Sequence, residues 1–232
     1  MLTLHHLPNS RSQRVIWLLE ELNLDYTLVI HGRDLFLRSA DESLKRIHPL
    51  GKAPVLCDGN TMIAETGAIF EYLLDNYSGN ILVPPKGCPE RVFYTYWRYF
   101  SEGSLMPFLS MKLVFARIVS GTPFFIRPLM SKIFRIVNTR YLNPNIFSEL
   151  DYIEQHLTQH RWFSGADFTA ADILIGFLLE AVSGRITDIK KYPKITDFVV
   201  RIRLRPAYQN ALKKGSWSQK DFNNYWAFLA KI

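Results

Sequence analysis

Hydrophobic residues in the first third of the chain alternate between strand-like and helix-like spacing. Residues 2–4 form a short apolar run typical of a strand, and a polar turn at residues 9–10 follows it. Apolar residues then recur at intervals of three and four over residues 15–22, which predicts one face of a helix. A β-rich run at residues 26–31 predicts a second strand.

A hairpin and a further helix complete this pattern. Two short apolar segments, residues 54–57 and 61–64, flank the sequence Asp58-Gly59-Asn60. An Asp-Gly pair between two such segments is typical of a tight hairpin turn. An amphipathic helix is predicted over residues 65–77. This order of elements predicts a small mixed sheet with helices packed on it.

The pattern changes after residue 77. Glycine and proline are concentrated between Ser78 and Pro89, which is typical of a domain boundary. Beyond it strand signals disappear and long helical patterns take over. We therefore predict an α/β domain at residues 1–78, a linker at residues 79–89 and an all-α domain at residues 90–232.

One helix start in the all-α part has a recognisable signature. Thr169 precedes Asp172 by three residues, directly before an apolar run. This spacing predicts a capping box, in which the threonine hydroxyl caps a backbone N–H and the carboxylate accepts from the threonine N–H.

Composition narrows the class of protein. The 232 residues are 48% hydrophobic and 14% aromatic, which allows a proper core and excludes disorder for most of the chain. The two cysteines, Cys57 and Cys88, cannot form a disulfide framework or a zinc site, and this favours a reducing, cytoplasmic location. No uncharged apolar run reaches the roughly 20 residues that span a bilayer, and no signal peptide is recognised, so we expect no transmembrane segment.

The positive charge is unevenly distributed. The net charge is +7, yet residues 1–77 carry 7 Lys or Arg against 10 Asp or Glu, a balance of −3. Residues 103–148 carry 6 Lys or Arg and no acid. The excess of positive charge therefore belongs to the all-α part. Such an excess is typical of proteins that contact nucleic acid or a membrane surface. The basic, apolar segment 108–140 matches no motif of determined role.

Ser10 is the first candidate for chemistry. It lies between the first predicted strand and the first helix, where backbone N–H groups favour negative charge. A hydroxyl there can donate to a thiolate, or it can simply cap the helix. Ser12 and Asn9 are alternative donors in the same turn.

Four motifs in order give the chain a family resemblance: residues 8–22, residues 48–55, residues 63–69 and residues 100–105. Together they resemble the cytosolic glutathione transferases of the serine type, similar to bacterial and fungal members. The resemblance implies a thioredoxin-like domain of order βαβαββα followed by an all-helical domain. It also implies that Ser10 holds the glutathione sulfur as a thiolate. Cysteine-type members carry a cysteine where this chain has Ser10, so chemistry through a protein thiol is not expected.

The same resemblance assigns the segment before the hairpin to glutathione. Pro54 is cis in the family, and the backbone of Ala53 pairs with the cysteinyl unit like an added strand. Lys52 is placed for the glycyl carboxylate, and His48 or Arg33 assists. Taken singly, Lys52 would more often be an ordinary solvated lysine.

The resemblance also implies a site for the γ-glutamyl end of glutathione. Thr66 takes its carboxylate and Glu65 its ammonium, although simple helix capping is the alternative for this pair. Glu102 reaches the γ-glutamyl ammonium bound by a partner subunit, which requires a homodimer.

The second substrate is less well defined. An apolar stripe on the first long helix of the all-α part could line its pocket or pack as core; its members are Met106, Phe108, Met111 and Phe115. Aromatic residues near the C-terminus could cover the same site or pack as core; they are Trp217, Phe222, Tyr225 and Trp226. The predicted activity is conjugation of glutathione, as cosubstrate, to a hydrophobic electrophile, without metal or permanently bound cofactor. Peroxide reduction and isomerisation stay open. The alternative is a non-catalytic protein whose basic helical domain contacts RNA, a polymerase or a membrane surface, although nucleic acid is not the expected partner.

Overall fold

The computed structural model describes residues 1–32, 42–183 and 189–227 of the chain. Arg33, an expected glutathione contact, lies outside the described residues. The chain forms two compact units, the first built from Met1–Cys88 and Arg201–Phe222 and the second from Pro89–Val200 and the residues after Phe222. The domain bounds drawn at residues 78 and 89 stay a prediction.

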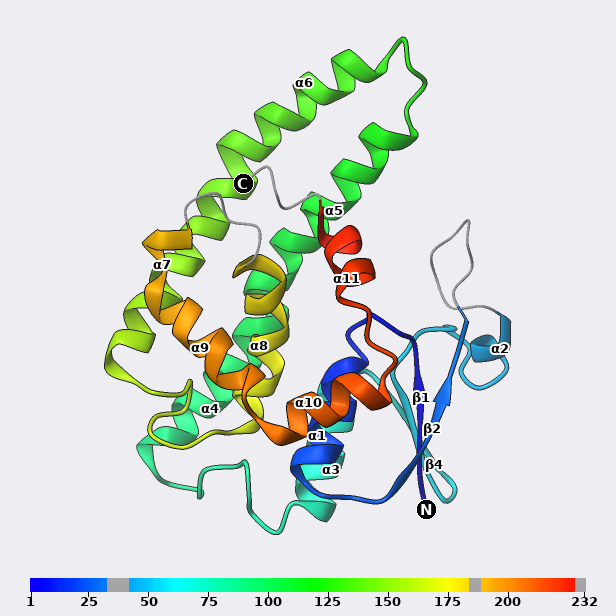
Figure 1. Ribbon diagram of the computed structural model, residues 1–232, viewed down its shortest axis with the longest axis vertical. Coiled ribbons are helices and arrows are strands. Elements are labelled where there is room, and N and C mark those ends of the chain that lie inside the picture. The colour runs from blue at the N-terminus through cyan, green and yellow to red at the C-terminus, as the bar shows by residue number, and fades with distance from the viewer. Residues whose placement is uncertain (33–41, 184–188, 228–232) are drawn as a thin grey trace. The chain divides into compact units, whose positions relative to one another are not determined.

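The first unit contains the predicted mixed sheet (Figure 1). Its strands are β1 (Leu2–His6), β2 (Tyr26–Ile30), β3 (Val55–Asp58) and β4 (Thr61–Ala64), in the order β2-β1-β3-β4. Strands β1 and β2 are parallel, and the other two pairs are antiparallel. The predicted hairpin joins β3 to β4, and Gly59 in its turn has a φ of 56°, which glycine adopts without strain.

Helices pack on this sheet. They are α1 (Gln13–Glu21), the short α2 (Glu42–Lys45) and α3 (Thr66–Tyr77). Helix α1 buries nearly all of its first two turns, from Gln13 to Leu19, which explains the dense apolar spacing of the sequence there. The thioredoxin-like arrangement expected from the family resemblance is confirmed.

A late helix, α10 (Pro206–Lys214), packs against α1 within the same unit. The Arg205 guanidinium donates from two nitrogens to the Glu21 carboxylate, at 2.6 and 2.7 Å. The Trp17 and Tyr208 rings meet edge to face with their centroids 4.9 Å apart. The C-terminal part of the chain is therefore integral to the sheet unit.

The remaining described chain is helical, as predicted, without a further β-strand in residues 89–183 or 189–227. Its elements are α4 (Pro89–Phe100), the π-helical η1 (Ser101–Leu105), α5 (Met106–Gly121), α6 (Arg127–Val137), the π-helical η2 (Asn138–Leu142), α7 (Asn143–Gln159), α8 (Ala170–Ser183), η3 (Ile189–Lys191), α9 (Pro193–Arg203) and α11 (Gln219–Trp226).

The core of the second unit is α8, in which every residue from Ala170 to Val182 is buried. At its start, one carboxylate oxygen of Asp172 accepts from the Thr169 N–H at 2.8 Å, as the predicted capping box requires. The Thr169 hydroxyl donates to the same oxygen at 3.0 Å, a charged acceptor that gives a strong bond, and the predicted bond from a backbone N–H to this hydroxyl is not seen among the described residues. The other oxygen accepts from the Phe163 N–H at 2.8 Å. Burial raises the pKa of Asp172 to about 6.

One continuous helical run, Pro89–Gly121, is long and apolar enough to cross a membrane by length and composition alone. Its most apolar window has a mean hydropathy of 1.3, and 22% of that window is buried within the protein. The run contains α4, η1 and α5, and the buried Lys112 lies in its second half. The sequence predicts that no uncharged apolar run reaches this length, and this run carries charged residues, among them Lys112 and Arg117. A single such run is weak evidence for a membrane span.

Candidate functional site

The strand register brings three loops to one end of the sheet. His5 in β1 pairs with Val55 in β3, and Val55 pairs in turn with Ala64 in β4. Because these neighbours are antiparallel, the end of β1, the start of β3 and the end of β4 lie together. Five predicted site residues occupy the segments that continue from this end: Ser10, Ala53, Pro54, Glu65 and Thr66.

A buried chain of hydrogen bonds supports Ser10. Its Oγ lies 2.7 Å from Ser12 Oγ and accepts from the Ser12 backbone N–H at 3.2 Å. Ser12 Oγ lies 2.7 Å from His6 Nδ1, and His6 Nε2 lies 3.0 Å from the Gly215 carbonyl oxygen. The carbonyl can only accept, so His6 Nε2 carries a proton. A neutral His6 then accepts from the Ser12 hydroxyl, which leaves Ser12 Oγ to accept from Ser10.

Exposure separates the two serines of this turn, whereas Asn9 is half-buried like Ser10. Ser12 is fully buried and also contacts the Leu7 backbone, with its Oγ 3.2 Å from both N and O. Asn9 accepts at its Oδ1 from the Ser218 backbone N–H at 2.9 Å. Ser10 is the hydroxyl that is partly exposed. The geometry favours Ser10 as the donor to a ligand, and its role remains a prediction.

The peptide bond between Ala53 and Pro54 is cis, as the resemblance implied. Pro54 is buried and directly precedes β3, whereas Ala53, one residue earlier, is half-buried. Among the described residues, no backbone hydrogen bond involves Ala53. Its N–H and C=O are therefore available for an extended peptide that adds to this end of the sheet.

The two basic side chains near this loop differ in their surroundings. Lys52 is exposed, and none of the described residues forms an ion pair with it. The His48 ring is half-buried, and its Nδ1 accepts from the Leu50 N–H at 3.4 Å. Lys52 can therefore reach an anionic group without breaking an existing contact, and His48 keeps its Nε2 for a ligand.

The start of α3 presents backbone N–H groups beside two polar residues. Thr66 is buried and is the first residue of the helix. Glu65 is exposed and has a φ of 71° and a ψ of 128°, a left-handed value that is uncommon for a residue other than glycine. Such conformations cost about 1–3 kcal/mol and cluster at ligand sites. The helix start combines free N–H donors, a hydroxyl and a carboxylate.

Two family comparisons match this arrangement. Residues 4–81 match the glutathione S-transferase N-terminal domain, and residues 135–215 match the C-terminal domain. Glutathione S-transferase 3 of Schizosaccharomyces pombe is 34% identical over 92% of this chain and 88% of its own length. The chain belongs to the glutathione S-transferase family. The family resemblance seen in the sequence is thereby confirmed.

Two further members support the same assignment. Glutathione S-transferase 1 of Saccharomyces cerevisiae is 29% identical over 92% of this chain and 95% of its own. The crystal structure of a glutathione S-transferase from Actinobacillus pleuropneumoniae is 32% identical, with a TM-score of 0.78 over 99% of both chains. The glutathione S-transferase fold therefore extends over the whole chain.

Glu102 lies in the helical unit of the protein and not in the unit that contains the sheet. It lies on η1 in the helical unit and is half-buried. The five residues at the sheet end lie in the other unit. The expected contact of Glu102 with glutathione held by a partner subunit stays a prediction.

The predicted electrophile stripe is largely packed inside the helical unit. Met106 is buried, and the Phe108 ring meets the Tyr141 ring edge to face at 5.9 Å. Phe115 stacks on Phe134 with centroids 5.9 Å apart. These contacts favour a packing role for most of the stripe.

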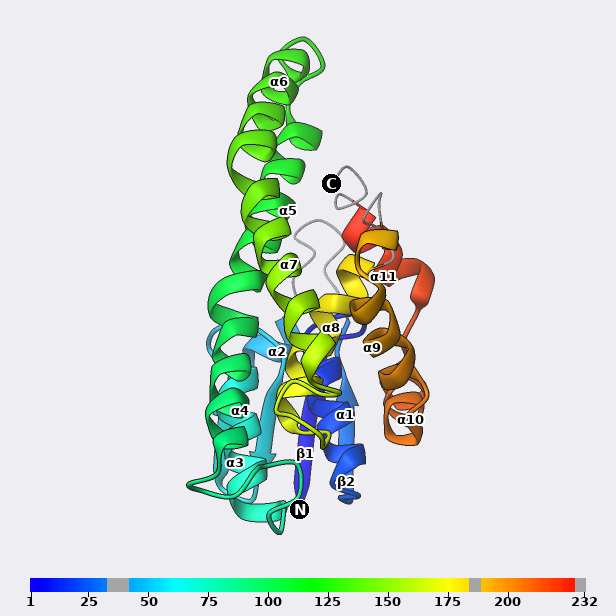
Figure 2. The ribbon, with the colours of Figure 1, turned by 90° about the vertical axis from the view of Figure 1, so that its left-hand side faces the viewer.

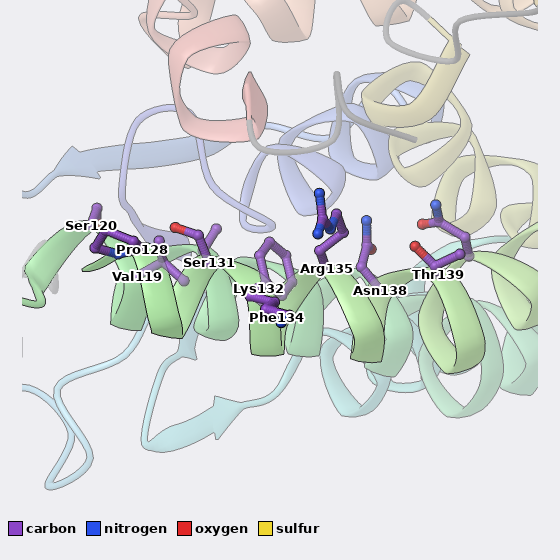
Figure 3. A pocket seen from close by; sticks show the side chains of 11 residues that line it. Val119, Ser120, Pro128, Ser131, Lys132, Phe134, Arg135, Asn138 and Thr139 are labelled. Atoms are coloured by element: carbon purple, nitrogen blue, oxygen red, sulfur yellow. The ribbon is translucent and has the colours of Figure 1, made fainter. Parts of the chain in front are cut away.

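A cavity of about 830 Å³ lies between α5, α6 and η2 (Figure 3). Arg135, Asn138 and Thr139 project from one side of the α6–η2 run in this view. Lys132 and Phe134 also line the cavity, which mixes apolar and cationic surface. The Asn138 side chain is largely buried, and its Oδ1 has no hydrogen-bond partner among the described residues. Four predicted stripe residues are absent from its lining: Met106, Phe108, Met111 and Phe115.

Sequence reasoning missed His6 and Gly215. His6 is completely buried at the end of β1, next to the almost buried His5. A polar side chain in a strand buried on both faces was the available signal, because such a group needs a partner. Its carbonyl partner lies 209 positions away, which no local pattern could indicate.

Proposed function

We propose that this chain is a glutathione transferase in which the Ser10 hydroxyl stabilises the glutathione thiolate. The thiolate then adds to a hydrophobic electrophile. The family membership supports the reaction, and the position of Ser10 supports the role of that residue. The observation that carries the proposal is the partly exposed Ser10 hydroxyl held at the start of α1 by the buried Ser12 and His6 chain.

The hydrogen-bond chain explains how Ser10 can be oriented and still serve a ligand. The Ser12 N–H holds the Ser10 oxygen, so the hydroxyl proton can turn from Ser12 toward an incoming thiolate. Ser12 loses no essential partner, because it keeps its contacts with His6 and the Leu7 backbone. The nearby start of α1 adds backbone dipoles that favour negative charge.

The expected gain can be stated in thiol ionisation. A hydrogen bond to a charged group contributes about 1.5–3 kcal/mol, or about one to two pKa units. A thiol with a pKa of roughly 8.5 is about 3% ionised at neutral pH, and this shift raises the fraction to between about 25% and 75%. The sulfur lone pair then forms the S–C bond, and with an aryl halide the leaving halide takes the electron pair of the broken bond. No oxidant or reductant is needed.

We further propose that the surrounding residues bind the rest of the tripeptide. Lys52, assisted by His48, holds the glycyl carboxylate, and the Ala53 backbone before Pro54 pairs with the cysteinyl unit. At the start of α3, Thr66 with its N–H groups holds the γ-glutamyl carboxylate. This division matches each charge of glutathione with a group of opposite charge or a fixed donor.

The γ-glutamyl ammonium and the assembly complete the proposal. Glu65 holds this ammonium, and Glu102 of the partner subunit of a homodimer contacts it from outside. The homodimer and a cytoplasmic location are expected from the family. The electrophile is hydrophobic, and its pocket is drawn from the helical domain.

The test combines binding, turnover and one substitution. The full chain is retained on a glutathione matrix, eluted with free glutathione and assayed with an aryl halide. For Ser10→Ala we expect the thiol pKa of bound glutathione to rise by about one to two units and kcat/KM at neutral pH to fall about 8- to 25-fold, in proportion to the thiolate fraction. The thiol pKa is followed by thiolate absorbance. Ser148→Ala, an exposed serine on α7, is the matched control and leaves both values unchanged.

Three outcomes would contradict parts of the proposal. A protein that does not bind glutathione at all contradicts the whole assignment. Binding without turnover of aryl halides, hydroperoxides or isomerisable substrates favours the non-catalytic alternative. Full activity of Ser10→Ala with loss in Ser12→Ala or Asn9→Ala moves the role to another donor.

A further inference from the structure

The hairpin formed by α5 and α6 ends in an exposed apolar tip, which we define as residues 122–129. Phe124 is 80% exposed and Phe125 is 69% exposed, and Ile126 and Leu129 are exposed beside them. Both views of the ribbon show α5 and α6 side by side, with the tip extending beyond α7, α8 and α9 of the same unit (Figures 1 and 2). Exposed apolar groups concentrated at a protruding tip are typical of an interaction surface.

The tip is a defined structure. The Arg127 guanidinium donates to the carbonyl of Thr122 at 3.1 and 3.3 Å and to that of Ser120 at 3.4 Å. The Phe124 and Phe125 rings meet edge to face with centroids 5.6 Å apart. The turn therefore holds both rings outward at the end of the hairpin.

Helix α6 continues the exposed apolar surface and adds positive charge to it. Leu129, Ile133 and Ile136 are exposed at intervals of four and three, which places them along one stripe. Lys132 and Arg135 are exposed on one side of this stripe, where they also line the cavity described above, and no residue of α6 is buried in the described structure. A helix with an apolar stripe flanked by cations is the pattern of an interfacial membrane helix.

The charge of the whole segment has one sign. Residues 103–148 contain 6 Lys or Arg and no Asp or Glu, and they include the entire hairpin. A partner that complements this surface must offer negative charge at its boundary and an apolar interior behind it.

We propose that the tip of the α5–α6 hairpin inserts into the interface of an anionic lipid bilayer. The two phenylalanine rings enter the boundary between headgroups and acyl chains. The stems of Lys132 and Arg135 lie along this boundary while their charged ends contact lipid phosphates. The hairpin lies in the interface and does not span the bilayer.

Two other occupants fit the surface less well. Nucleic acid would neutralise the cations, but it offers no apolar interior for the exposed isoleucine and leucine stripe. A second copy of the hairpin would bring two acid-free cationic segments together, which is unfavourable. Both remain distinguishable outcomes of the test.

The test is flotation of the full chain with vesicles of phosphatidylcholine alone or mixed with phosphatidylserine. We expect binding to the anionic vesicles only, with affinity that falls as salt is raised. The double variant Phe124→Ser with Phe125→Ser should lose about tenfold or more in affinity, because it lacks the two inserted rings. Its matched control is Leu204→Ser, a 76% exposed leucine outside the hairpin, which should bind normally.

The cationic contribution is tested separately. The variant Lys132→Glu with Arg135→Glu should also lose about tenfold or more in affinity. Lys86→Glu with Lys220→Glu makes the same change in net charge at exposed positions outside the hairpin and should have a small effect. Arg127 is left unchanged because it holds the turn. Circular dichroism confirms that every variant is folded.

Insertion itself is read from Phe125→Trp. Its emission should be quenched by brominated anionic lipid more strongly than that of the native protein, whose five tryptophans lie outside the tip. Absence of binding to anionic vesicles, or equal binding by the phenylalanine variant, overturns the proposal. So does a loss of self-association in the phenylalanine variant without any vesicle binding, because a second copy would then cover the tip. Nucleic-acid binding that depends on Lys132 and Arg135, without vesicle binding, has the same consequence.

Discussion

Lys112 is a buried cation whose removal should stabilise the protein. It lies on α5 with no exposed surface, and its Nζ donates to Asn143 Oδ1 at 2.9 Å. A neutral amide oxygen does not compensate a buried charge as a carboxylate would. Accordingly, burial lowers the pKa of Lys112 from 10.5 to about 8.

The size of the effect follows from this pKa. At neutral pH the lowered value corresponds to a cost of up to about 3 kcal/mol for keeping the ammonium charged in the folded state. Methionine has a similar shape and removes that cost. It also leaves the Asn143 side chain without its donor, which lowers the free energy of unfolding by about 1–2 kcal/mol. We therefore expect Lys112→Met to raise the free energy of unfolding by about 1–2 kcal/mol at pH 7.

The sign of the pH dependence gives a second check. Between about pH 8 and 10.5 the unfolded state binds a proton at Lys112 that the folded state has released, so native stability rises with pH in this window. Lys112→Met lacks this rise, and its advantage over the native protein should shrink from neutral to alkaline pH. The measurement is urea unfolding of both proteins across that range.

Two controls make the outcome decisive. Lys132→Met alters an exposed lysine on α6 and should change stability by less than about 0.5 kcal/mol. Lys112→Arg keeps a charge that cannot be neutralised and should destabilise. If Lys112→Met is less stable than the native protein at pH 7, or its advantage does not fall with rising pH, the reasoning is refuted.

Two further stability changes follow from the helix ends. Asp172→Ala removes the acceptor of the Phe163 and Thr169 N–H groups and should lower the free energy of unfolding by about 2–4 kcal/mol, measured by denaturant titration with Asp172→Asn as the milder comparison. Because the folded pKa of Asp172 is raised to about 6, the folded state takes up a proton there before the unfolded state does, and native stability should rise as pH falls from 6 to 4. If the difference in free energy of unfolding between the native protein and Asp172→Asn does not change over this pH range, the expectation is contradicted. Arg205→Ala breaks the two-bond ion pair with Glu21 and should lower stability by about 1–2 kcal/mol, whereas an unchanged midpoint would show that the α1–α10 contact is apolar in origin.

Local patterns predicted the elements whose cause is local. The apolar period over residues 15–22 identified the body of α1, and Asp58-Gly59 identified the hairpin because its turn needs a left-handed residue. The loops of the site were found through motif order, since spacing alone could not separate Ser10 from Ser12. In the folded chain Ser10 is partly exposed and Ser12 is buried, which favours Ser10 as the donor to a ligand.

The features that the sequence could not reveal depend on distant contacts. The His6 ring hydrogen-bonds the Gly215 carbonyl, which fixes its tautomer. Glu21 forms an ion pair with Arg205, which lies 184 positions away in the sequence. The Thr169 hydroxyl was expected on a backbone N–H because the capping pattern carries no information on where a buried carboxylate points. The basic segment was recognised by composition, but only its position on a protruding hairpin gave it a role to test.

The hydrogen bond from His6 to Gly215 also bears on the order in which the protein matures during synthesis. The first strand emerges from the ribosome long before residues 201–222, which belong to the same compact unit. Until that late segment arrives, α1 lacks α10, and His6 lacks the acceptor that fixes its tautomer. The hydrogen-bond chain from Gly215 through His6 and Ser12 to Ser10 is therefore complete only once this late segment has been synthesised.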